Sequence, residues 1–114
     1  MEDRRKLKRR YLLFYSRVFD MKSGRLIGYL SNITPEGASL ICDEPVTTDT
    51  TYRLRMDLPE EGFNRDHLMF DAKAVYCKPD VDPNFFVTGF QLQGVPNEDI
   101  DIIQRIVQEY GFRD

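Results

Sequence analysis

Six short segments with alternating apolar and polar side chains restrict the fold of this chain more than any other feature. A period of two indicates strands with one buried face, and proline, glycine or aspartate separates each segment from the next. The predicted strands are 11–19, 26–33, 38–42, 51–58, 67–78 and 85–92. The apolar positions are Tyr52, Leu54, Met56 and Leu58 in the fourth segment, and Leu68, Phe70, Ala72, Ala74 and Tyr76 on one face of the fifth. Short strands at this spacing are typical of an antiparallel β-sandwich or β-barrel.

The period changes near the end of the chain, where apolar residues recur every three or four positions. This spacing predicts an amphipathic helix over about 97–110 that packs on the strands. Asn97 is the expected N-cap, Glu98 and Asp99 favour the positive end of the helix dipole, and Gly111 can end the helix. The apolar face consists of Ile100, Ile103, Val107 and Tyr110, widened by Ile102 and Ile106.

The length and composition suit one globular domain. A chain of 114 residues, 41% of them hydrophobic, can bury one core without disulfides or a structural metal. No apolar run approaches the roughly 20 residues that cross a bilayer, and no signal-peptide segment follows the basic N-terminal residues. We therefore expect a cytoplasmic protein without membrane insertion. Cys42 and Cys77 are too few for a disulfide framework or a zinc site, so we expect two reduced thiols and no bound metal.

Catalytic motifs are absent from the sequence. His67 is the only histidine, and it opens a predicted strand after a charged loop, where a histidine is more often a surface residue than a general base. No nucleophile elbow, metalloprotease helix, phosphate-binding loop or paired-cysteine motif occurs. We expect no enzyme, no catalytic residues and no cofactor.

Charge divides the chain into a basic arm, 1–10, and a remainder, 11–114, that is predicted to form the folded domain. The arm carries six basic and two acidic side chains, and the remainder 10 basic and 17 acidic ones. A general nucleic-acid binder spreads positive charge over a face of its fold, so this distribution suits a small anionic ligand better than a polymer. In an extended arm, Arg5 and Arg9 lie on one side about 13 Å apart. Arginine can bond to guanine, clamp phosphate and stack on bases, although a solvated basic tail is the simpler interpretation of such a run.

A second polar feature lies where the second predicted strand ends, in Asn32–Gly37. Asn32 and Thr34 are two positions apart, so their amide and hydroxyl groups project to the same side. Gly37 is expected to give the turn a backbone conformation that other residues resist. Such a pair can read a base edge or a ribose-phosphate, and an ordinary hairpin turn is the alternative.

Together these two features resemble the ligand motifs of the PilZ domain family, RxxxR followed by [D/N]xSxxG. Residues 5–9 fill the first motif and residues 32–37 the second, with Thr34 where the family usually has serine. The resemblance covers almost the whole chain and extends to Thr88-Gly89-Phe90 in the last strand. It implies an all-β fold with one helix: a six-stranded antiparallel β-barrel followed by a C-terminal α-helix. It also implies a non-catalytic receptor that binds the bacterial second messenger cyclic di-GMP.

The resemblance assigns roles to individual residues. Arg5 and Arg9 would contact guanine and phosphate, whereas Asn32, Thr34 and Gly37 would shape the base-recognising turn. Arg4, just before the first motif, would stack on a second ligand molecule. Ordering of the arm around the ligand would then alter the surface offered to an unidentified protein partner.

Two other functions are compatible with the sequence. The chain could be a PilZ-like protein that has lost nucleotide binding and acts as a protein–protein interaction module. A small barrel that binds single-stranded nucleic acid through the arm and its aromatic residues is a third possibility. The acidic remainder disfavours this third reading, and the presence of both arginines disfavours the second.

Overall fold

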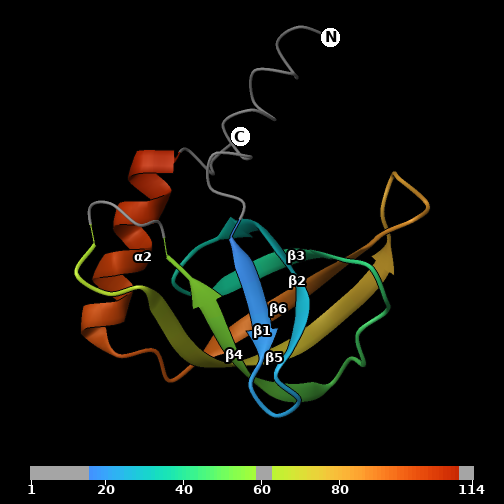
Figure 1. Cartoon of the computed structure of the whole chain (residues 1–114), viewed down its shortest axis with the longest axis horizontal. Coiled ribbons are helices and arrows are strands. Elements are labelled where there is room, and N and C mark those ends of the chain that lie inside the picture. The colour runs from blue at the N-terminus through green and yellow to red at the C-terminus, as the bar shows by residue number, and fades with distance from the viewer. Residues whose placement is uncertain (1–15, 59–62, 111–114) are drawn as a thin grey trace, which may run out of the picture.

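The computed structural model describes residues 16–58 and 63–110. The basic arm with Arg4, Arg5 and Arg9, the first part of the predicted first strand and Gly111 lie outside the described residues. In the described part, six antiparallel strands close into a barrel in the order β1-β2-β3-β6-β5-β4 (Figure 1). The strands are β1 (Arg17–Asp20), β2 (Arg25–Ile33), β3 (Gly37–Cys42), β4 (Thr50–Asp57), β5 (His67–Pro79) and β6 (Phe86–Gln93), and helix α2 (Asn97–Tyr110) follows them. The predicted fold class is confirmed.

The core follows the alternation that the sequence predicts. Leu54, Met56 and Leu58 of the fourth segment are buried, and so are the alternate residues of β5 as far as Ala74. Helix α2 stands at one side of the barrel and adds Ile103 and Ile106 to the same core (Figure 1). The helix covers the predicted residues 97–110, but the Pro96 carbonyl accepts the first helical hydrogen bond from Ile100 N–H at 3.0 Å, so Pro96 is the N-cap. Asn97 is therefore a helical residue and not the N-cap.

One strand changes face along its length, which the sequence pattern did not predict. The pairing of β5 with β6 shifts register between Ala74 and Tyr76, so that one extra residue is accommodated in β5. Beyond such a bulge the in–out alternation is inverted. Val75 and Tyr76 are both exposed, and Cys77 faces the barrel interior against Thr88. The prediction that Tyr76 lies on the same face as Ala72 and Ala74 is wrong for this reason.

A salt bridge joins helix α2 to the segment before β5. Arg65 Nη1 lies 2.5 Å from a carboxylate oxygen of Asp99, whose side chain is 6% exposed. Arg105 of the same helix lies over the ring of Phe63, 4.4 Å from its centroid. Asp99 is thus an internal partner of Arg65, besides being placed to favour the helix dipole.

Candidate functional site

The β2–β3 turn contains the predicted motif residues and is held by its own hydrogen bonds. Thr34 N–H donates to the Gly37 carbonyl at 2.8 Å, and Gly37 N–H donates to the Thr34 carbonyl at 3.3 Å. The Thr34 hydroxyl oxygen accepts from the backbone N–H groups of Glu36 at 3.3 Å and Gly37 at 3.2 Å. Asn32 Oδ1 accepts from Ile33 N–H at 2.8 Å. Both side chains that were predicted to read a ligand therefore also support the local backbone.

Gly37 acts differently from the expectation. Among the described residues the positive φ angles belong to Gly24, Gly94 and Asp49, so Gly37 does not need the left-handed conformation. Instead, a Cβ at Gly37 would lie 3.0 Å from the backbone carbonyl oxygen of Phe90. Glycine is favoured here because the backbones of β3 and β6 approach closely, and a side chain would press on a backbone atom that cannot rotate away.

A shallow hollow of ≈ 240 Å³ lies beside this turn, on the outer face of the barrel. Its lining combines the motif residues with residues of β3, β5 and β6: Asn32, Thr34, Gly37, Ala38, Ser39, Val75, Tyr76, Gly89 and Phe90. The structure therefore brings Asn32, Thr34 and Gly37 together at one site. Whether Arg4, Arg5 and Arg9 reach it stays a prediction, because they lie outside the described residues.

Tyr76 is the residue of this hollow that the sequence interpretation missed. Its ring covers Gly89, where an added Cβ would overlap the ring atoms, and its side chain is still 43% exposed. The Lys78 ammonium lies 5.4 Å from the ring centroid. A glycine in the middle of a strand signals a close approach by another group, so Gly89 was the available clue. An exposed aromatic face beside an amide can stack on a planar ring while the amide bonds to its edge.

The described chain enters the barrel close to this hollow. The Ser16 carbonyl accepts a hydrogen bond from Leu30 N–H at 2.8 Å, and Leu30 precedes Asn32 by two residues on β2. The Ser16 hydroxyl donates to the Asp57 carbonyl, which fixes the start of β1 against β4. Ser16, the first described residue, is therefore a fixed point near the motif turn.

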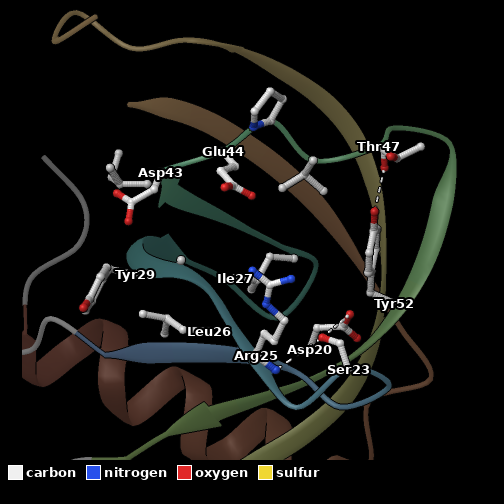
Figure 2. A pocket seen from close by; sticks show the side chains of 14 residues that line it. Asp20, Ser23, Arg25, Leu26, Ile27, Tyr29, Asp43, Glu44, Thr47 and Tyr52 are labelled. Atoms are coloured by element: carbon white, nitrogen blue, oxygen red, sulfur yellow. Dashed lines mark hydrogen bonds between the residues drawn. The ribbon is translucent and has the colours of Figure 1, made fainter. Parts of the chain in front are cut away.

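A larger cleft, of ≈ 340 Å³, lies at the opposite end of β2 (Figure 2). It is bounded by the β1–β2 turn and by the chain that follows β3, and Tyr52 at its side donates to the Thr47 carbonyl at 3.2 Å. Its charged lining residues are Asp20, Arg25, Asp43 and Glu44. One guanidinium against three carboxylates disfavours an anionic ligand, so this cleft is a poor candidate for nucleotide binding despite its size.

Two kinds of feature are absent from the described residues. No helix in this part of the chain is long and apolar enough to cross a membrane. Within residues 16–58 and 63–110, no group of three or more histidine, cysteine, aspartate or glutamate side chains could hold a metal ion.

Solved structures with the same fold are found despite low sequence identity. One is the PilZ domain of YcgR from Escherichia coli, solved with c-di-GMP; it is 11% identical with a TM-score of 0.64, over 84% of this chain and 80% of that one. Another is MotI/DgrA of Bacillus subtilis, an inhibitor of motility, which is 14% identical with a TM-score of 0.64 over 83% of this chain. The match covers 47% of that chain, about half its length. No curated protein matches the sequence.

These likenesses agree with the closed barrel order and the C-terminal helix. The family comparison covers nearly the whole chain, since the PilZ domain matches residues 3–109. This chain therefore belongs to the PilZ domain family.

Proposed function

We propose that this chain is a non-catalytic receptor for cyclic di-GMP that binds the dinucleotide in the hollow beside the β2–β3 turn. The observation that carries the proposal is the grouping of Asn32, the turn and the exposed Tyr76 ring around one hollow. Tyr76 offers a surface on which a guanine can stack, and Asn32 offers an amide for the edge of the base. YcgR, which shares this fold, was solved with c-di-GMP, and this supports the choice of ligand.

The arginines of the arm complete the proposed site. Arg9 precedes Ser16 by seven residues, an extended reach of about 23 Å from the fixed start of β1. That reach is enough for Arg9 and, further along the arm, Arg5 to lie over a ligand in the hollow. Cyclic di-GMP carries two phosphates and two guanines, and guanidinium groups bind both kinds of group bidentately. The arm would supply the positive charge that the motif turn lacks.

Binding would change the surface offered to another protein. With the arm fixed across the hollow, the ligand phosphates neutralise the basic side chains of the arm. The ligand also covers the exposed ring of Tyr76. We propose that a protein partner distinguishes the free from the ligand-bound surface and that the receptor therefore acts as an adaptor. As a receptor for a bacterial second messenger, it is proposed to act in the cytoplasm.

A second candidate function has one observation in its favour. The Thr34 hydroxyl oxygen already accepts two backbone hydrogen bonds, so the motif turn is stable without a ligand. A PilZ-type interaction module that no longer binds nucleotide would keep such a turn for structural reasons. This candidate leaves the exposed aromatic ring over Gly89 unexplained, and the receptor is the better interpretation.

Isothermal titration calorimetry with cyclic di-GMP separates the two candidates. The receptor predicts saturable binding, with little response to GMP or cyclic di-AMP. Arg9→Ala should weaken the binding, whereas Arg25→Ala, a matched arginine change in the acidic cleft, should leave it unchanged. A flat titration of folded protein would favour the interaction module.

A further inference from the structure

Two cysteines, on the strands either side of β6, share one threonine hydroxyl inside the barrel. The Cys42 thiol donates to Thr88 Oγ1 at 3.7 Å, and the Thr88 hydroxyl donates to Cys77 Sγ at 3.4 Å. Val46 N–H also donates to Cys77 Sγ at 3.4 Å. Both cysteines are free, and neither belongs to the hollow beside the motif turn.

The two thiols differ in their accessibility to solvent and to small molecules. Cys42 is 1% exposed, and burial raises the pKa of its thiol, so it stays protonated and inaccessible. Cys77 is partly exposed and opens into a separate hollow of ≈ 460 Å³. The other lining residues are Pro45, Val46, Thr47, Thr48, Pro79 and Phe86. A hollow of this size can hold a small molecule attached to the Cys77 sulfur.

The sheet prevents the two cysteines from forming a disulfide with each other. Strand β6 lies between β3 and β5, so their backbones are separated by about two strand spacings, or nearly 10 Å. Their registers also differ, since Cys42 pairs with Phe86, whereas Cys77 pairs with Thr88. Disulfides require Cα atoms closer than about 7 Å. A disulfide at Cys77 therefore needs a sulfur from outside the chain.

Cys77 also lies directly behind the hollow that contains Tyr76. Tyr76 pairs with Gly89, and Cys77 pairs with Thr88. Because successive side chains of a strand alternate, those of Tyr76 and Cys77 lie on opposite sides of the barrel wall. Val46 and Thr88 both donate hydrogen bonds to the Cys77 sulfur, and a group added to that sulfur competes with them. The preceding residue on β5, Tyr76, carries the ring that lies over Gly89.

We propose that Cys77 is a site of reversible mixed-disulfide formation with a small thiol, and that the modification weakens ligand binding on the opposite side of the β5–β6 ladder. The effect on ligand binding rests on the proposed function, whereas the formation of the mixed disulfide does not. The Cys77 sulfur attacks a small disulfide, a new S–S bond forms, and the old S–S bond breaks. The second thiol of the small disulfide leaves as a thiolate and takes up the proton that Cys77 loses. A small thiol in excess reverses the reaction.

The first experiment treats the folded chain with oxidised glutathione and measures intact mass. We expect one adduct per chain, located at Cys77 by peptide mapping, absent from Cys77→Ser and removed by dithiothreitol. Cys42→Ala should keep the adduct, and if that variant does not fold, peptide mapping of the wild type still locates the modification. No adduct on the native chain, or an adduct on Cys42, would overturn the proposal.

The second experiment measures the consequence for the other face. In a two-dimensional NMR spectrum without nucleotide, the adduct should shift the backbone signals of Tyr76 and Gly89. Unchanged signals there would refute the coupling, whatever the ligand. In calorimetry, the adduct should weaken cyclic di-GMP binding by about fivefold or more, the effect of losing one or two hydrogen bonds. Equal affinity also refutes the coupling, whereas failure of the unmodified chain to bind would refute the proposed function and leave the thiol site standing.

Discussion

Replacing Tyr76 with alanine tests the proposed site most directly, because it removes the ring and leaves the motif turn intact. Stacking of a base on an aromatic side chain contributes about 1–3 kcal/mol to binding. The Lys78 ammonium lies 5.4 Å from the ring centroid, so a base that stacks on the ring competes with a cation–π contact of about 0.5–1 kcal/mol. The net loss for Tyr76→Ala is therefore about 1–2 kcal/mol, or roughly 5- to 30-fold in affinity.

The stability of the ligand-free protein should fall only moderately. Tyr76 is 43% exposed and outside the core, so its removal uncovers the surface over Gly89 and no core side chain. Filling this surface with water creates no cavity in the interior. We expect the free energy of unfolding to fall by about 1–2 kcal/mol.

Calorimetry with cyclic di-GMP and thermal melting without it measure the two effects separately. Tyr76→Phe keeps the ring and should bind as the wild type does. Val81→Ala, at a fully exposed position in the β5–β6 hairpin, is a matched loss of apolar surface away from the hollow. Normal affinity of Tyr76→Ala would refute the stacking role, and a large fall in melting temperature would show that the ring is structural.

The other predictions concern the arm, the turn and the helix. Arg5→Ala and Arg9→Ala should each weaken cyclic di-GMP binding by about 1–3 kcal/mol in calorimetry, with an unchanged melting temperature in the absence of ligand; an early melt would show a structural arm. Thr34→Ala should lower the free energy of unfolding by about 0.5–1.5 kcal/mol in urea titrations, because two turn N–H groups lose their acceptor, while Thr34→Ser should retain stability. Arg65→Ala should destabilise the protein by about 1–3 kcal/mol, less than for a fully buried pair because Arg65 is 38% exposed; the same effect in a background lacking the Asp99 carboxylate would exclude the salt bridge as its cause.

The strands and the helix were predictable because burial on one face imposes a simple period on the sequence. Residues 51–58 and 97–110 show this most clearly, and both match the structure closely. The motif turn was predictable for the same reason, since strand ends and turn residues are local signals. Asn32, Thr34 and Gly37 do meet at one hollow.

The remaining features depend on contacts between distant segments, which no local pattern contains. The bulge before Tyr76 moves that ring from the predicted inner face to the outer one, and it becomes visible only when β5 is aligned with β6. The approach of Phe90 to Gly37 and the pairing of Arg65 with Asp99 likewise join residues far apart in sequence. Sequence reasoning therefore identified the motif turn and missed the aromatic surface opposite it.

The shortness of β1 has a consequence for how the barrel opens. Its four residues pair with both β2 and β4, and among the described strands β1 has the fewest paired residues. Amide protons there and on the facing part of β4 should exchange with deuterium sooner than those between β5 and β6. Five residues, 11–15, separate the arm from Ser16 in the sequence, so anything that fixes the arm should also reduce the opening of β1. Slower deuterium uptake across β1 and β4 would then show that the arm has bound the ligand. The ligand itself would not contact these two strands.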